Sequence, residues 1–136
     1  MRQIVMTALI FVSALMLCGM GGLGGEPEGT LPDTEQDFSV KIVDRSGVTT
    51  YLSNFSMDGS TFLHGQLGSA SVTIPFEDIL SASFKSLANE RITVELALAD
   101  DKELTLKIRR RSGFAGKMEV GVYHIRAEDV ARIDFE

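Results

Sequence analysis

Hydrophobic and polar side chains alternate along most of the chain after residue 37. A period of two is typical of strands that bury one face, because successive side chains point to opposite sides of a sheet. Short groups of Gly, Asn, Asp and Ser interrupt the alternation, as expected of turns. The pattern predicts roughly nine or ten short strands. In the clearest strand the two faces are formed by Leu104, Leu106 and Ile108 and by Thr105, Lys107 and Arg109.

One motif occurs twice in the chain. The segments Val72–Phe84 and Tyr123–Phe135 each contain an extended apolar stretch, an acidic Glu-Asp corner and a second apolar stretch that ends in Phe. Pro75 cannot donate to a β-ladder, so the first segment must end its strand there or lie at a sheet edge. We therefore predict a short helical turn at Phe76–Ile79 and a matching turn in the second segment, each followed by a last strand.

The two segments belong to a longer internal repeat. Five residues recur 51 positions later, whereas earlier apolar pairs such as Leu52 and Ile108 are 56 positions apart. Such self-similarity at fixed spacing indicates a duplicated unit. The drop from 56 to 51 predicts five extra residues in the first unit, which we place in a protruding tip at Asn54–Ser60. The identical pairs are Gly65 with Gly116, Ile74 with Ile125, Glu77 with Glu128, Asp78 with Asp129 and Phe84 with Phe135; the other early apolar pair is Ile42 with Leu98.

These features predict an all-β domain over residues 38–136. We expect a small sandwich or barrel built from two tandem repeats of about 50 residues, 38–85 and 91–136, because one repeat has too few strands to bury both faces of a core. The predicted core consists of Val40, Ile42, Leu52, Phe62, Val72, Ile74, Ile79, Phe84, Val94, Leu96, Leu106, Ile108, Tyr123, Ile125, Val130, Ile133 and Phe135.

The first 25 residues differ in composition from the rest of the chain. An apolar run from Ile4 to Cys18 follows Arg2 and leads into a glycine-rich stretch that ends at Gly25. This arrangement favours a secretory signal peptide with a helical leader. Two alternatives stay open: an uncut membrane anchor, and a lipoprotein acylated at Cys18, although the bulky Leu17 suits acylation poorly. Residues 26–37 are acidic and contain two prolines, which predicts a flexible linker.

Charge and cysteine usage narrow the functional classes. The chain has a formal net charge of −6, and the part from Glu26 onward carries −7. An acidic surface repels phosphate backbones, so we expect no nucleic-acid partner. The only cysteine lies in the leader. Disulfides, Cys-ligated zinc and a Cys nucleophile are therefore not expected in the folded part.

The only concentrated positive charge is Arg109–Arg111, followed closely by Phe114. Arginines bind carboxylate, sulfate or phosphate groups with paired hydrogen bonds, and an aromatic ring can stack on a sugar or base. We therefore take Arg109, Arg110, Arg111 and Phe114 as the candidate ligand-binding residues. The alternative is that three charges at a hairpin end form a solvated tip that discourages aggregation.

The duplicated carboxylates Glu77-Asp78 and Glu128-Asp129 are a second candidate site. If the two corners converged, they could bind a divalent metal or divide acid and base roles in a small hydrolase. We favour a structural role, in which the carboxylates stabilise the start of each helical turn. No nucleophile elbow, phosphate-binding loop or zinc-protease motif is present in the sequence. His64 and His124 have no ligand partner at metal spacing, so we expect no metal and no cofactor.

The sequence therefore predicts an exported, non-catalytic β module that binds or scaffolds at the cell envelope. Its expected location is periplasmic or extracellular, with membrane contact only through a retained leader. The expected partner is a protein or an acidic glycan. A small metal-dependent hydrolase and a reader of anionic lipid through Arg109–Arg111 are the alternatives.

Overall fold

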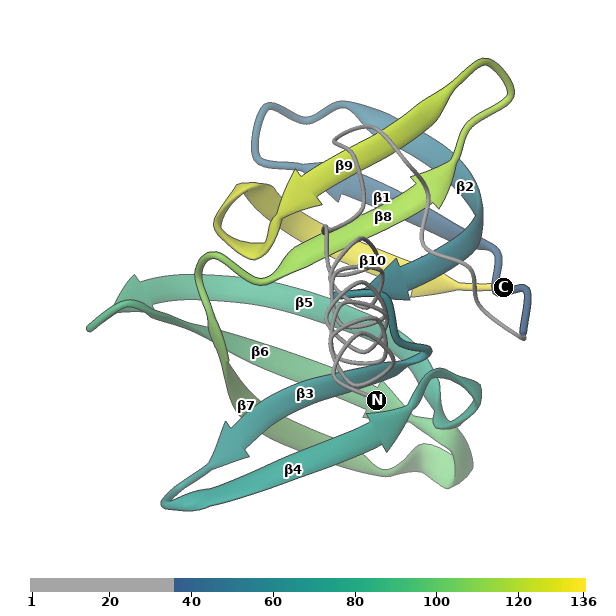
Figure 1. Ribbon diagram of the computed structural model, residues 1–136. Helices are drawn as coiled ribbons and strands as arrows, with labels where there is room; N and C mark the ends of the chain where they lie inside the picture. Colours follow the sequence, from purple (N-terminus) through teal and green to yellow (C-terminus); the bar gives the residue numbers. More distant parts are fainter. Residues whose placement is uncertain (1–35) are drawn as a thin grey trace, which may run out of the picture.

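The computed structural model describes residues 36–136 as a single antiparallel sheet that curls into a half-barrel (Figure 1). The predicted all-β class is confirmed. Among the described residues, helical structure is limited to three-residue 3₁₀ turns. The strands are β1 (Val40–Asp44), β2 (Thr49–Met57), β3 (Phe62–Leu67), β4 (Ala70–Pro75), β5 (Ile79–Ala88), β6 (Arg91–Leu98), β7 (Glu103–Arg109), β8 (Gly113–Lys117), β9 (Val122–Arg126) and β10 (Val130–Phe135).

The order of strands in the sheet is β4-β3-β7-β6-β5-β10-β1-β2-β8-β9. This order has an internal symmetry. If each strand is exchanged with the strand five places away in the chain (β1 with β6, β2 with β7, and so on), the same order results, read backwards. In Figure 1, β3–β7 form the lower half of the molecule, and β1, β2 and β8–β10 form the upper half. Each half therefore combines the last three strands of one predicted repeat with the first two strands of the other.

The ladder register corrects the predicted spacing in the first two strands of each unit. Val40 pairs with Leu52 and Phe135, and Val94 pairs with Leu106 and Phe84. Corresponding residues of these early strands are therefore 54 positions apart, and the predicted spacing of 56 is wrong. A shift of two residues keeps every side chain on the same face of a strand, so the hydrophobic pattern could not distinguish the two alignments.

The predicted protruding tip at Asn54–Ser60 is also wrong. β2 continues through this segment to Met57, and Phe55, Ser56 and Met57 are completely buried. The extra length is partly absorbed by a bulge between Ser53 and Ser56, where Asn54 has a φ of 48°. Bulges bend a strand without ending it, so an insertion in one strand need not produce a loop.

The two halves share one hydrophobic core. Most of the predicted core residues are buried, but Phe62 is only half-buried, because its neighbour Leu63 takes the inward position opposite Ile74. Three large rings were missed: Phe55 stacks on Phe114 with ring centroids 5.6 Å apart and contacts Phe76 at 5.5 Å. Val72, Tyr123, Ile125 and Phe135 pack against the core and are only partly buried.

The predicted helical turns are present as η2 (Phe76–Asp78) and η4 (Ala127–Asp129), one before β5 and one before β10. Each turn buries its first residue, and neither has a side-chain capping hydrogen bond. The acidic residues lie in the first turn, as the favoured structural role requires, but their side chains do not form the capping hydrogen bonds that this role also predicted.

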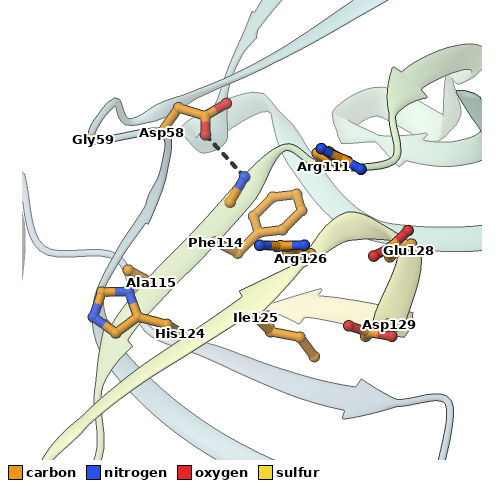
Figure 2. A pocket seen from close by; sticks show the side chains of 11 residues that line it. Asp58, Gly59, Arg111, Phe114, Ala115, His124, Ile125, Arg126, Glu128 and Asp129 are labelled. Carbon is orange, nitrogen blue, oxygen red and sulfur yellow. Dashed lines mark hydrogen bonds between the residues drawn. The ribbon is translucent and has the colours of Figure 1, made fainter. Parts of the chain in front are cut away.

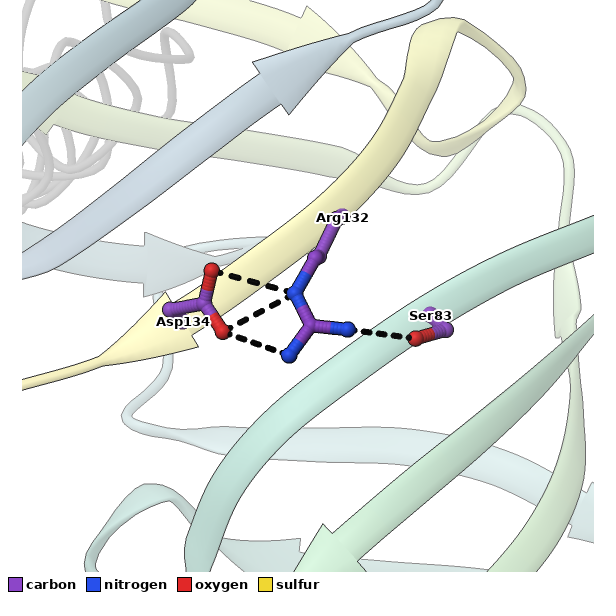
Figure 3. Close-up of polar contacts among 3 residues, drawn as sticks. All are labelled: Ser83, Arg132 and Asp134. Atoms are coloured by element: carbon purple, nitrogen blue, oxygen red, sulfur yellow. Dashed lines mark hydrogen bonds and ion pairs between the residues drawn. The ribbon is translucent and has the colours of Figure 1, made fainter.

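The two halves meet where β5 pairs with β10. The ladder has three residue pairs, including Arg132 with Ser83. The Arg132 guanidinium donates to both oxygens of Asp134, and its Nη1 donates to Ser83 Oγ at 3.1 Å (Figure 3). The hydrogen bonds that Arg132 donates to Asp134 raise the pKa of Arg132. The group is exposed, so it contributes at most about 1 kcal/mol, and the main link between the halves is the shared core.

The predicted leader and most of the linker lie outside the described residues. Within residues 36–136 the structure contains no helix with the length and hydropathy that a bilayer-spanning segment requires. At the end of the linker, Asp37 Oδ1 accepts a hydrogen bond of 2.7 Å from the Asn54 N–H group, which fixes the chain just before β1.

Gly116→Ala should destabilise the fold by about 1–3 kcal/mol, the typical cost of overpacking a core. A Cβ atom at Gly116 would lie 2.8 Å from Leu52 Cβ and 3.2 Å from the Ser53 carbonyl oxygen, so β2 and β8 would have to separate. Gly113→Ala is the matched control on the same strand, since its Cβ would meet Asp58 Oδ1 at an ordinary 3.5 Å. Urea unfolding measures both, and equal stability losses would contradict the close packing of β2 on β8.

Candidate functional site

The predicted site segment, Arg109–Arg111, connects β7 to β8. Three backbone hydrogen bonds hold it: Arg110 N–H donates to the Glu90 carbonyl at 3.1 Å, Glu128 N–H donates to the Arg110 carbonyl at 3.0 Å, and Ala127 N–H donates to the Ser112 carbonyl at 2.8 Å. The segment is therefore fixed between the β5–β6 turn and η4. This position determines where each arginine points.

The three arginines do not form one cluster. Arg109 lines a cavity on the β3–β7 side, whereas Arg111 lines a separate pocket next to β9. Arg110 lies between two acidic side chains, with its Nε 2.6 Å from Glu90 Oε2 and 3.8 Å from Glu128 Oε2. Arg110 therefore joins the turn to η4, and its charge is already compensated.

Arg109 contributes to a cavity of about 280 Å³ that we call the basic cleft. Two more cations, Arg91 and Lys107, line it with Arg109. Its other lining residues are Asp58, His64, Gly65, Gln66, Ser71 and Ser112.

The sheet register places the three cations together. Arg91 of β6 is directly paired with Arg109 of β7. Lys107 is two residues before Arg109, so both side chains lie on the same face of β7. The intervening Ile108 is buried, which directs Lys107 and Arg109 to the outer face. On the other side, Lys107 pairs with Gln66, the single ladder pair between β7 and β3.

The positive charge of the basic cleft has little compensation from the protein. Within residues 36–136, none of the four ion pairs involves Arg91, Lys107 or Arg109. The only carboxylate in the cleft is Asp58, and its Oδ1 already accepts the Gly113 N–H at 2.9 Å. Like charges placed opposite each other on paired strands destabilise a sheet, so a bound anion would relieve an unfavourable arrangement.

Neutral polar groups complete the basic cleft. His64 Nδ1 lies 3.3 Å from Thr73 Oγ1, and its ring packs edge-on against Phe62 at 4.7 Å. Gln66 and Ser71 are directly paired across β3 and β4, so their side chains point to the same face. The cleft can therefore hold an anionic group by charge and add hydrogen bonds from an amide and hydroxyl groups.

The pocket next to β9 is larger, at about 590 Å³, and has mixed charge (Figure 2). Arg111 and Arg126 line it together with Asp58, Glu128 and Asp129, so carboxylates outnumber guanidinium groups. Figure 2 shows Asp58 joined to the Gly113 backbone at one end of this pocket. This pocket is therefore less suited to an anion than the basic cleft.

The last predicted site residue, Phe114, lies mainly in the core. Its side chain is 1% exposed and packs against Phe55 and Phe84. A ring buried to this extent presents almost no face on which a ligand could stack.

None of the three described cavities is lined by both acidic corners. Glu128 and Asp129 line the pocket next to β9, whereas Glu77 and Asp78 line none of the three cavities described in residues 36–136. That part of the chain also contains no group of three or more potential metal-ligating side chains. The second corner instead affects Tyr123, whose pKa is raised by burial and, to a smaller degree, by the charges of Asp44 and Asp129.

The sequence identified one residue of the basic cleft and missed the others. Arg109 stands in a visible run of arginines, but Arg91 and Lys107 are separated from it in sequence. One signal was available, because the alternation of the predicted strand places Lys107 and Arg109 on one polar face. The pairing of Arg91 with Arg109 depends on the register of the β6–β7 hairpin, which the alternation does not determine.

Residues 34–136 match the model of a family described as "Uncharacterised protein", and the chain belongs to this family. The match includes every strand of the sheet. No curated protein matches the chain, and no solved structure matches it.

Tyr123→Phe should reduce the loss of stability at high pH. The phenol has a higher pKa in the folded state than its ordinary value of 10.0. The unfolded chain therefore ionises first, and this contribution to stability is complete below pH 10 and is lost as pH rises through the folded-state pKa. Urea unfolding between pH 8 and about pH 11 should show a steeper fall for the wild type than for the variant. Tyr51→Phe, at a 64% exposed site, is the control, and equal slopes for Tyr123→Phe and wild type would contradict the assignment.

Proposed function

We propose that this chain is an exported, non-catalytic β module that binds acidic groups of an envelope partner through the basic cleft. The observation that carries the proposal is the pairing of Arg91 with Arg109, beside Lys107, without an ion pair in the described part of the chain. The cations in this cavity repel one another, and no acidic side chain within residues 36–136 forms an ion pair with them. A bound anion would offset this repulsion.

The chemistry of the basic cleft favours carboxylate or sulfate groups on a glycan. Guanidinium groups form paired hydrogen bonds with such planar or tetrahedral anions. A glycan also offers hydroxyl groups that Gln66 and Ser71 can hydrogen-bond. Nucleic acid is a poorer candidate, because the chain carries a net charge of −6 and binding to nucleic acid depends on neutralising many phosphates.

The proposed location rests on the leader. The apolar run after Arg2 and the small residues that follow it favour export to the periplasm or the cell exterior. A domain without cysteine is compatible with an oxidising compartment, since it has no thiol to protect there.

We also propose that the β domain arose by tandem duplication, with the two units exchanging their first hairpins. Three features support this history: the strand order that is unchanged by a five-strand exchange, the matching ladder registers and the two 3₁₀ turns. The basic cleft then lies where the third strand of one unit meets the second strand of the other.

Arg109→Glu should weaken binding of a polygalacturonate oligosaccharide at least tenfold, because a hydrogen bond to a charged group contributes about 1.5–3 kcal/mol. Lys102→Glu, at the other end of the β6–β7 hairpin and outside all described cavities, makes the same change in net charge and should leave binding unchanged. Isothermal titration at low salt measures both. Wild-type protein that binds neither polygalacturonate nor a sulfated glycan would refute the proposal.

Arg109→Glu should also stabilise the unliganded domain, by several tenths to about 1 kcal/mol, because it replaces a repulsive cross-strand pair by an attractive one. The gain should shrink at high salt, since these side chains are exposed. Urea unfolding at two salt concentrations measures the effect. Arg110→Gln is the contrasting variant: it removes compensated contacts to Glu90 and Glu128 and should destabilise slightly. A lower stability of Arg109→Glu than of the wild type would contradict the repulsion between the cleft cations.

A further inference from the structure

The sheet has two open edges, β4 and β9, which end the strand order. β4 is paired only with β3, and β9 only with β8. An outermost strand presents unpaired N–H and C=O groups that can template pairing with another chain. Proteins normally protect such edges with charged residues, Pro or a bulge. The two edges of this sheet differ in this protection.

The β4 edge is almost unprotected. From Ala70 to Ile74 it carries no charged residue, and it has no bulge over its six ladder pairs with β3. Only Pro75, at the end of the strand, limits pairing. On the β9 edge the corresponding positions include His124 and Arg126, both exposed. Of the two edges, β4 is therefore the one suited to add another strand.

The ladder register identifies the groups that face outward from β4. Phe76 N–H donates to the Thr61 carbonyl, so hydrogen-bonded pairs alternate from there through Ile74, Val72 and Ala70. The two residues between them, Ser71 and Thr73, direct their N–H and C=O groups away from β3. The free edge thus offers two donors and two acceptors at the spacing that an antiparallel strand requires.

We propose that β4 pairs antiparallel with β4 of a second copy of the chain, about a two-fold axis through Val72. Ser71 then lies opposite Thr73 of the second copy, and the four N–H groups of these residues find carbonyl partners across the axis. Ser–Thr pairs on facing strands are favourable, and the uncharged strand brings no like charges together. The interface is isologous, the commonest arrangement in soluble oligomers, and both open β4 edges are closed by one contact.

The dimer has a consequence for the basic cleft. Ser71 belongs both to the β4 edge and to the lining of the cleft. Directly paired residues have their side chains on the same face of a sheet, so the two-fold axis places both clefts on one face of a continuous sheet. Resting on the proposed function, this arrangement makes the dimer a bivalent receptor for a linear acidic polymer, whose second contact benefits from high effective concentration.

Thr73→Pro tests the pairing, because it removes an outward N–H group and leaves the backbone hydrogen bonds between β4 and β3 in place, at the loss of the Thr73 Oγ1 contact to His64 Nδ1. His124→Pro is the matched control, since His124 is the corresponding outward-facing position of the β9 edge. Light scattering after gel filtration of the full chain should give a dimer for wild type and His124→Pro and a monomer for Thr73→Pro. Ser71→Lys with Thr73→Lys, which sets lysines opposite lysines across the axis, is the second variant and should also be monomeric.

A wild type that stays monomeric at high concentration, or a dimer that persists in both β4 variants, overturns the pairing. If His124→Pro alone is monomeric, the dimer contact lies at β9, and the proposed β4 pairing is wrong as well. Polygalacturonate binding separates this result from the proposed function. Thr73 does not itself line the cleft, so Thr73→Pro should keep binding single short oligosaccharides and lose at least tenfold affinity for the long polymer. If the wild type is monomeric but binds the oligosaccharide, the pairing is wrong and the proposed function is supported. If the wild type is a dimer that binds no oligosaccharide, the pairing is supported and the proposed function is wrong.

Discussion

The structure depends on the requirement that ten short strands bury their inner faces in one core. Each half of the sheet combines strands of both predicted repeats, since β3–β5 are completed by β6 and β7, and β8–β10 by β1 and β2. The first hairpin of each predicted repeat therefore pairs with strands of the other predicted repeat. Because of this arrangement, side chains from both halves fill one shared core. The stacked rings of Phe55 and Phe114 illustrate this exchange between repeats, since they come from β2 and β8, which belong to different predicted repeats.

The same exchange creates the basic cleft. β3 and β7 belong to different predicted repeats, and they share a single ladder pair, Gln66 with Lys107. Where a ladder is so short, neighbouring strands can diverge and leave a cavity between their outer faces. β3 and β7 lie close together at Gly65, where an added Cβ atom would be only 3.1 Å from Leu106 Cβ and 3.2 Å from the Lys107 carbonyl oxygen. The positively charged residues of β6 and β7 therefore line a cavity and do not lie on a flat sheet surface.

Charge and edge chemistry point to the same side of the molecule. The uncompensated cations lie on the outer face of β6 and β7, and the uncharged β4 edge is two strands away from β7. An acidic ligand and a second copy of the chain would use neighbouring surfaces without competing for the same groups, because one is held by side chains and the other by the backbone. If the proposed function and the proposed dimer both hold, weak binding at each cleft would be strengthened because two clefts contact the same polymer.

The sequence by itself determined the strands, the two 3₁₀ turns, most of the core and the polar face on which Lys107 and Arg109 lie, because these follow from local alternation and turn chemistry. It could not decide between spacings of 54 and 56 in the early strands, since a slip of two residues leaves the pattern unchanged. The tertiary structure alone decided which strands are neighbours, that Arg91 faces Arg109, that Arg110 is neutralised between Glu90 and Glu128, and that Phe114 lies in the core. These are contacts between distant parts of the chain, and alternation reports which face a residue occupies but not which residue lies opposite it.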